Sequence, residues 1–541
     1  MDQGDDILPK WSRRFLKAIC PAYLLEEIEG DLLQKYKFDI SDYGEGRARK
    51  KLVWNILSFF HPVILLRNKF SLRLNQTIML KNYLITALRV SKRQKVYSFI
   101  NVIGLSVGLS SALLIAIYIA DEMSYDRHID DAERIYRVGI NETFKGDEIL
   151  YSDTPAPLAD AMRREMSNVE DVVRVMVHEN PVRRDDRAFT VKRFMTTDAN
   201  FFTFFGYNLI EGNTKEALKG PDKIVLTVSA AKKYFDYDGK SGESPIGKQL
   251  LVGRQAKPVE VTGIIKDPPQ NTHMKFDMVL SLETTSYSKN ECWPCYGVKT
   301  YFKTITQSGT ADVETKLEEF AQKRIIPAIE KDLDISHERF VKSGDIVKFF
   351  IDPMLSIHLE SNIDSEFEPN GDIRYVYILG AIGIFLVLVA CINFMNLATA
   401  RAINRGKEVG VRKTMGATRT SLVPQFMTES FLHVGTSGAL ALVLAAVALA
   451  PFNDLSGKQL SLESLMDPTL IGYVLLGLIV VGLLAGAYPA FYLTSFNPVA
   501  VLKTGKLQGQ TKSYFRSSLV VLQFTISIVM IIGTMIVYKQ V

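Results

Sequence analysis

Cys292 and Cys295 flank a Trp-Pro dipeptide and have the C-x-x-C spacing of redox and metal sites. Three interpretations are open: a local structural disulfide, free or metal-bound thiols, or a catalytic thiol pair. The disulfide is favoured, because thiols oxidise readily in an external compartment such as a bacterial periplasm. The flanking sequence also lacks the thioredoxin-like βαβ pattern that a catalytic pair needs.

Other catalytic patterns are missing from the sequence. It contains no Gly-x4-Gly-Lys-Ser/Thr phosphate loop, so the chain does not encode this kind of nucleotide binding. Its seven His show no H-x3-H or HExxH pairing. We therefore expect no catalytic residue, cofactor or metal site in this chain, and no nucleic-acid partner.

A basic, glycine-containing segment, residues 401–429, holds six Lys or Arg. One interpretation is a solvated loop whose charges only set membrane topology. The other is a docking element for a partner protein, because Val409, Val411 and Met415 are interspersed with the charges. Just before this segment, Asn393 and Asn396 lie one helical turn apart. Such amides usually join helices within a membrane, and a role on a substrate path is the alternative.

Five apolar runs are long enough for a helix to cross a bilayer core of ~30 Å. They cover residues 96–120, 375–400, 430–452, 470–493 and 517–538. The fold class that follows is an α-helical multi-span membrane protein with a large domain inserted between its first two spans.

Basic and acidic residues are distributed unevenly along the chain. The 541 residues carry a net charge of +5, but residues 121–374 hold 34 basic and 44 acidic residues. The remainder holds 30 basic and 15 acidic residues. Because basic residues stay on the cytoplasmic side of a membrane, this pattern places residues 121–374 outside and the N-terminus inside. The connection between the third and fourth spans agrees, since its only basic residue is Lys458.

The composition excludes two other classes of protein. Hydrophobic residues make up 47% and charged residues 23%, which disfavours a disordered chain. Four Cys are too few for a small disulfide scaffold.

Two regions flank the first span. Residues 1–75 form a cytoplasmic prefix domain, in which the stretch Leu52–Leu66 is expected to lie along the membrane surface, held by Arg67, Lys69 and Arg73. Residues 121–374, the external domain, mix strand and helix signals as an α+β fold. A strand end at Ile224–Leu226, a helix at Val228–Phe235 capped by Thr227 and a strand at Val259–Ile265 are expected. The amphipathic stretch Ala311–Leu333 is expected to be a helix interrupted at Pro327.

Several sequence blocks resemble FtsX/MacB-type permeases of ABC transporters. The family pattern R..E-[IV]-G-[IV]-R-[KM]-x-x-G-A is matched by Arg405, Glu408, Val409, Gly410, Val411, Arg412, Lys413, Gly416 and Ala417. Blocks similar to the MacB-type periplasmic domain are DEMSYDRHIDDAERIYRV, IVLTVSAAKKYF, VEVTGIIKDPPQNTHMKFDMVLS and DPMLSIHLES. The block GAYPAFYLTSFNPVAVLK resembles a later part of the family, and residues 9–36 resemble a prefix domain of such permeases in Bacteroidetes-type bacteria.

The resemblance implies a function and partners. The matched residues of 401–429 would form the coupling helix, which seats in a separate ABC-type ATPase subunit that binds ATP and Mg²⁺. The fifth span would open a second repeat, so we expect the sequence to lack the second half of an eight-span permease. Further implied partners are a second permease copy, as a homodimer or paired half, membrane lipid and a periplasmic adaptor.

The expected function is an inner-membrane permease that couples the partner's ATP hydrolysis to motion of the periplasmic domain. This arrangement suits export of peptides, drugs or lipoproteins from the periplasmic side. The alternative is an FtsX-like regulator of a cell-wall hydrolase without cargo transport. Catalytic thiol chemistry at Cys292 and Cys295 is a third hypothesis.

Overall fold

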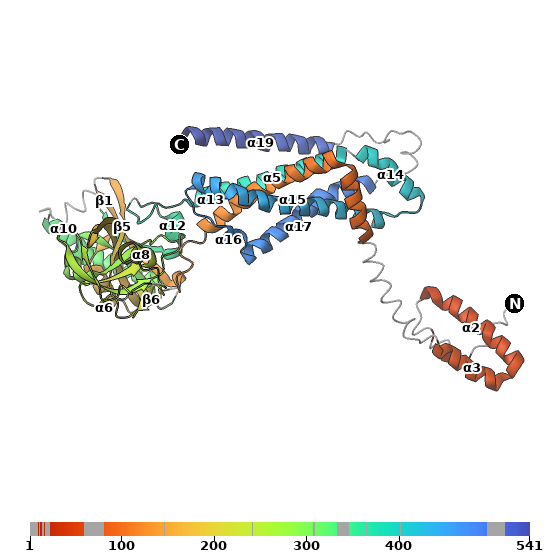
Figure 1. The fold of residues 1–541 in the computed structure, drawn as a ribbon, viewed down its shortest axis with the longest axis horizontal. Coiled ribbons are helices and arrows are strands. Elements are labelled where there is room, and N and C mark those ends of the chain that lie inside the picture. Colours follow the sequence, from red (N-terminus) through yellow and green to blue (C-terminus); the bar gives the residue numbers. More distant parts are fainter. Residues whose placement is uncertain are drawn as a thin grey trace. The chain divides into compact units, whose positions relative to one another are not determined.

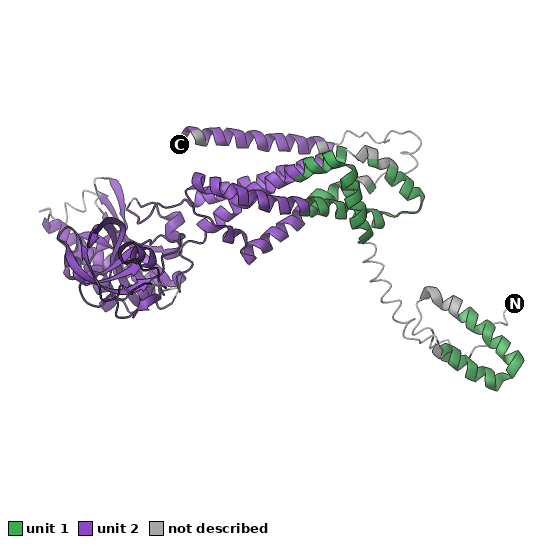
Figure 2. Ribbon diagram, viewed as in Figure 1, with its two compact units in different colours: residues 1–102, 397–435, 482–512 green, residues 103–396, 436–481, 513–541 purple. Residues whose placement is uncertain are grey.

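The computed structural model describes most of the chain (Figure 1). The described residues are 9, 11, 12, 16, 22–58, 81–144, 146–240, 242–306, 309–332, 346–363, 365–400, 402–494 and 514–540. They fall into two compact units, shown in Figure 2: residues 1–102, 397–435 and 482–512 form the first, and residues 103–396, 436–481 and 513–541 the second.

The prefix region contains an antiparallel helical pair, α2 (Ala22–Tyr43) and α3 (Glu45–Ser58). Gly44 joins them with a φ of +76°, a left-handed conformation that glycine adopts without steric cost. Leu52 and Ile56 of α3 are buried in the core of this pair. Within the stretch expected to lie along the membrane surface, these two side chains therefore point into the hairpin core, where α2 covers them. Residues 59–66 of that run, and Arg67, Lys69 and Arg73, lie outside the described residues.

Five helices among the described residues are long and apolar enough to cross a membrane, which supports the predicted fold class. They are α5 (Lys95–Glu122), α13 (Ile373–Ala400), α15 (Arg419–Ser456), α17 (Pro468–Thr494) and α19 (Tyr514–Gln540). The third is much longer than the apolar run 430–452. The same helix continues through the polar residues before that run, back to Arg419. In this added part, Leu422 and Phe426 are buried on one side of the helix.

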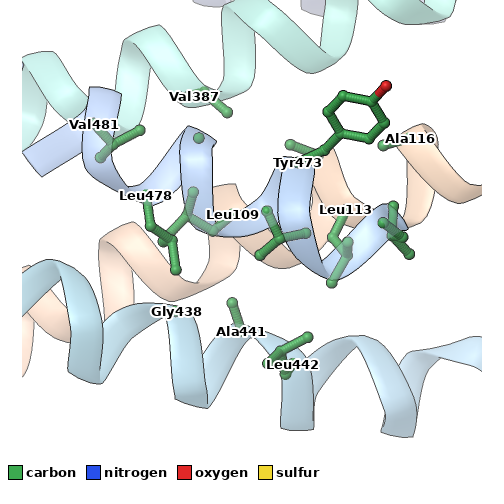
Figure 3. A pocket seen from close by; sticks show the side chains of 14 residues that line it. Leu109, Leu113, Ala116, Val387, Gly438, Ala441, Leu442, Tyr473, Leu478 and Val481 are labelled. Carbon is green, nitrogen blue, oxygen red and sulfur yellow. The ribbon is translucent and has the colours of Figure 1, made fainter. Parts of the chain in front are cut away.

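Small residues let the membrane helices approach closely. A Cβ added to Gly108 of α5 would lie 2.8 Å from Cβ of Ala390 on α13, and one added to Gly438 of α15 would lie 2.8 Å from Leu478 of α17. Beside the second contact, a cavity of about 240 Å³ lies among these four helices (Figure 3). Aliphatic side chains, two glycines and Tyr473 line it, and none of its lining side chains is charged.

The described residues of the external domain form one mixed 12-stranded sheet, whose main path runs β12-β1-β11-β4-β5-β10-β7-β9-β6. The strands are β1 (Ile135–Phe144), β2 (Asp147–Tyr151), β3 (Thr154–Pro155), β4 (Val169–Arg184), β5 (Arg187–Thr197), β6 (Leu209–Gly212), β7 (Lys223–Thr227), β8 (Gln249–Val252), β9 (Lys257–Ile265), β10 (Met278–Ser281), β11 (Tyr296–Thr304) and β12 (Ile346–Pro353). The longest pairing is the antiparallel hairpin of β4 and β5. Parallel pairs occur at β5–β10 and β7–β9.

Short helices cover this sheet. They are α6 (Pro157–Glu165), α7 (Phe201–Phe204), α8 (Val228–Phe235), α9 (Thr310–Phe320), α10 (Ile326–Asp332) and α12 (Ile357–Glu360), with 3-10 turns at Ala132–Arg134, Leu282–Thr284, Ser286–Lys289 and Met354–Ser356. Helix α8 has the predicted bounds, and the Thr227 hydroxyl accepts the predicted capping bond from the Ala230 N–H. Its apolar face packs in a core with β7, β8 and β9, whereas α6 and α9 pack in a separate core with β1 and β11.

The predicted helix at 311–333 is modified rather than broken at its proline. A π-helical turn, Ala321–Ile325, joins α9 to α10 two residues before Pro327. A wider turn removes the clash between the proline ring and the carbonyl one turn earlier, so the chain direction is preserved.

Buried polar residues fasten both ends of the external domain to its sheet. Near the entry from α5, the Asp126 carboxylate lies 2.7 Å from Nδ1 of His273, whose Nε2 lies 2.9 Å from the Tyr301 hydroxyl on β11. Burial would raise the pKa of Asp126, but His273 and its hydrogen bonds outweigh this effect and lower the pKa. Near the exit toward α13, the fully buried Arg137 of β1 donates to Asp352 and Glu366.

We predict that Arg137→Leu lowers the free energy of unfolding of the external domain by about 3–5 kcal/mol, because Glu366 would be left as a buried, unpaired carboxylate. Urea unfolding followed by circular dichroism measures the loss. The matched control is Arg187→Leu, whose pair with Asp236 is exposed and screened by solvent, so that its loss should change the stability little. Equal effects of the two substitutions would contradict the importance assigned to the buried pair.

Candidate functional site

The segment 401–429 folds as a short helix and a tight turn ahead of a membrane helix. Helix α14 (Ala402–Thr414) is labelled in Figure 1. It ends where Gly416 adopts a φ of +95°. The Gly416 N–H donates to the Lys413 carbonyl and the Ala417 N–H to the Arg412 carbonyl. These bonds satisfy carbonyls that the helix end leaves open, as expected for a glycine-terminated helix. The glycine in the family pattern therefore sets the turn between α14 and α15.

A partly buried ion pair fixes α14 against α15. The Arg405 guanidinium donates two parallel bonds to the Glu429 carboxylate, at 2.7 and 2.8 Å. Burial would lower the pKa of Arg405, but the bonds to Glu429 outweigh this effect and raise it. The planar guanidinium and carboxylate match in geometry, so the pair sets the angle between the helices as well as joining them.

Two further contacts hold the same face of α14. Val409 is buried with Leu422 and Phe426 of α15 and with Ala490 of α17. The Lys413 ammonium donates to the Thr494 carbonyl at 2.7 Å, at the C-terminal end of α17. A cation there also interacts favourably with the helix dipole. Helix α14 is thus attached to the ends of two membrane helices.

The opposite face of α14 is open. Val411 is 47% exposed and Met415 is 83% exposed, and both are apolar. Glu408 lies on the same face and pairs with Arg412 one turn later. A hollow of about 460 Å³ adjoins this face, lined by residues that include Tyr83, Met415, Ala417 and Gln425. An exposed apolar pair beside a hollow on a fixed helix is a surface suited to contact with another protein.

The residues of the family pattern therefore divide between two roles. Arg405, Val409, Gly410 and Lys413 face the protein interior or bond to it, whereas Glu408, Val411 and Gly416 are exposed. Arg412 and Ala417 are half-buried at the edge of the hollow. The sequence pattern alone could not separate these roles, because it did not reveal Glu429 and Thr494 as partners.

A second polar cluster lies where the external domain meets the spans, and we call it the Lys458 cluster. The Lys458 ammonium lies 2.9 Å from the Asp121 carboxylate and 2.8 Å from Oε1 of Glu122. The other Glu122 oxygen lies 2.6 Å from Nε2 of His358, and the Tyr125 ring stacks on the His358 ring at 3.4 Å. The cluster thus joins the end of α5, helix α12 and the connection between α15 and α17.

The surroundings of Lys458 favour its charged ammonium form. Burial would lower the pKa of Lys458, but its bonds to Glu122 and Asp121 outweigh this effect and raise it. Gly371, just before α13, comes so close that an added Cβ would lie 2.8 Å from Glu122 and 3.1 Å from His358. Sequence reasoning missed these partnerships, although Lys458 stood out as the one basic residue of an acidic connection.

The other candidate residues lie apart from these two sites. Cys292 and Cys295 form a disulfide with their Cα atoms 5.4 Å apart, ahead of β11. Asn396 of α13 donates to Gln523 of α19 at 3.4 Å, and Asn393 packs near Gly104 of α5, so both amides lie between helices. Among the described residues, no group of three or more His, Cys, Asp or Glu is placed to hold a metal ion.

Two protein-family models match the chain. The MacB-like periplasmic core domain matches residues 98–320, and the FtsX-like permease C-terminal domain matches residues 380–498. The first covers most of the external domain. The second includes all of α14, its turn and α15.

Relatives with assigned names agree with these models. The macrolide export ATP-binding/permease protein MacB of Bradyrhizobium diazoefficiens is 32% identical over 23% of this chain and 19% of its own length. That of Pasteurella multocida is 26% identical over 60% of this chain and 44% of its own length. The chain thus spans less than half the length of the MacB relatives it matches.

Solved structures match part of the chain only at low TM-scores. A permease domain from Porphyromonas gingivalis has 19% identity and a TM-score of 0.35, over 42% of this chain and 91% of that one. The periplasmic region of MacB from Actinobacillus actinomycetemcomitans has 15% identity and a TM-score of 0.28, over 43% and 92%. The family assignment rests on the two matched models: the chain belongs to the FtsX/MacB-type permeases of ABC transporters.

Proposed function

We propose that this chain is a permease subunit that transmits a conformational change from a separate ATPase subunit to its periplasmic domain. The observation that carries the proposal is the two-sided α14. Its inner face is fixed to α15 and α17 by Arg405, Val409 and Lys413, and its outer face exposes Val411 and Met415. A partner that binds the outer face and moves must also move the membrane helices.

The Lys458 cluster would connect the membrane helices to the external domain, at the other end of the proposed transmission. Through Asp121 and Glu122 it attaches the α15–α17 connection to the end of α5, and through His358 it attaches α5 to the external domain. Because Glu122 is buried, opening either of its contacts would leave its carboxylate short of a partner. Motion of α5 and of the α15–α17 pair is therefore coupled to the domain.

The described membrane bundle favours transmission of motion over transport through the subunit. The cavity among α5, α13, α15 and α17 offers aliphatic side chains and a single tyrosine, which suit a hydrophilic cargo poorly. Cargo would instead be captured at the periplasmic side, with peptides, drugs or lipoproteins as the proposed classes. ATP and Mg²⁺ would bind to the partner ATPase, and a second permease copy and a periplasmic adaptor would complete the assembly. The N-terminus would be cytoplasmic in the inner membrane.

The first functional prediction concerns docking. Met415→Asp, alone or with Val411→Asp, is expected to weaken binding of the cognate ATPase subunit about 30-fold or more, because each places a charge in a contact that excludes water. Glu408→Lys is expected to act in the same direction by reversing a charge on that face. Pull-down and titration of the detergent-solubilised permease with the ATPase measure the change.

Arg405→Ala is the informative comparison for these variants. It is expected to lower the melting temperature of the permease, since it leaves the partly buried Glu429 without its partner, whereas Met415→Asp leaves the melting temperature unchanged. If the variant with both Val411→Asp and Met415→Asp still bound the ATPase normally, the proposed docking surface would be refuted.

The second prediction concerns transmission. Lys458→Met should preserve ATPase binding but reduce the ATP-dependent movement of the external domain, because the α15–α17 connection is no longer held to Asp121 and Glu122. Pulsed electron paramagnetic resonance between one label in the external domain and one in α15 reads out the movement, with and without ATP.

Two variants control this experiment. Lys458→Arg keeps a cation and should retain most of the movement, while Lys240→Met removes an exposed lysine of the external domain and should have no effect. An undiminished ATP-dependent distance change in Lys458→Met would show that the cluster is not on the path.

A further inference from the structure

The exposed face of α3 carries an unusual combination of groups. Arg47 lies three and four residues before Lys50 and Lys51, and Trp54 lies four and three residues after them, which places all four on one side of the helix. Trp54 is 74% exposed, and its neighbour Val53 is 41% exposed. The opposite side, with Ala48, Leu52 and Ile56, is buried against α2. The basic, aromatic face is therefore not needed for the core of the hairpin.

The basic residues of this face differ in their contacts. Lys51 is held within the hairpin, 3.0 Å from the Asp39 carboxylate and 3.6 Å from the centre of the Tyr43 ring. Among the residues that the structure describes, neither Arg47 nor Lys50 has an ion-pair partner. Their charges, together with the exposed indole, remain available for an external surface.

The two helices of the hairpin have opposite charge. Helix α2 contains six acidic and two basic residues, whereas α3 contains one acidic and four basic residues. A negatively charged surface attracts α3 and repels α2, so it would orient the hairpin with Trp54 toward itself. A neutral surface would not select one side in this way.

The covalent connection brings such a surface within reach. Residues 59–80 separate α3 from the helix over 81–93 that precedes the first span. Even fully extended, these residues span at most ~75 Å, so the hairpin remains close to the bilayer at all times. A tether of this kind raises the effective concentration of the lipid surface for the hairpin.

We propose that the α2–α3 hairpin docks on the membrane surface through Arg47, Lys50 and Trp54 of α3, with anionic lipid headgroups as its binding partner. Arg47 and Lys50 attract the phosphate-rich surface, and the indole of Trp54 inserts at the headgroup level, where tryptophan is favoured. The hairpin thus acts as a peripheral lipid-binding module of the permease. This assignment does not depend on which ATPase or cargo the permease serves.

The chain's tryptophans allow a direct test. It has only three, so the background substitutions Trp11→Phe and Trp293→Phe leave Trp54 as the sole indole. The full chain is placed in nanodiscs containing brominated phosphatidylcholine, with either no phosphatidylglycerol or about one third. We expect blue-shifted Trp54 emission and strong quenching by the bromines only when the anionic lipid is present. Raising the salt to about 0.5 M should reverse both effects by screening the charges.

Two matched double substitutions test whether docking depends on the basic face of α3 or only on the net charge of the hairpin. Arg47→Glu with Lys50→Glu should shift the docking equilibrium at least ~10-fold toward the free hairpin. Lys35→Glu with Lys37→Glu changes the net charge equally but on α2, and should retain docking. Circular dichroism and melting of each variant check that the hairpin stays folded, as expected for substitutions at exposed positions.

Three results would overturn the proposal. The first is quenching that does not depend on anionic lipid. The second is an equal loss of docking in both charge-reversed variants. The third is shielding of Trp54 only after the partner ATPase is added, which would make this face a protein-binding surface instead.

Discussion

The buried contact between Glu122 and its two partners, Lys458 and His358, is the constraint on which the architecture depends. The chain passes from span to external domain at this point, and a carboxylate held away from water must keep its partners. This requirement keeps α12 and the α15–α17 connection at the end of α5. The fastening of Asp126 to His273 then continues the attachment into the sheet.

A similar device operates at α14. Arg405 and Glu429 form a bidentate pair with little exposure, and Lys413 caps the end of α17. Ion pairs that are largely removed from water add little net stability compared with apolar packing, but they tolerate few alternative geometries. Both sites therefore favour defined positions of the helices over a range of loose ones. That property suits a protein whose proposed task is to pass on movement.

Sequence reasoning succeeded where one local signal decides the outcome. Span length and hydropathy located the membrane helices, and Thr227 marked the start of α8 because its hydroxyl caps that helix. It was less informative where distant residues decide. Leu52 packs against α2, α15 begins as early as Arg419, and Lys458 pairs with Glu122, which lies far away in the sequence. Apolar periodicity reveals that a face is covered, but not by what.

The length of α5 has a mechanical consequence. With 28 residues it is ~42 Å long and exceeds the ~30 Å bilayer core, so it behaves as a lever with Glu122 at one end. A tilt of only ~5° about the far end displaces Glu122 by ~4 Å. That distance is larger than the range over which a hydrogen bond survives. A small rotation of α5 therefore either moves the neighbouring elements with it as one body or breaks their contacts with Glu122. A gradual rotation of α5 is thus converted into an abrupt change at these contacts.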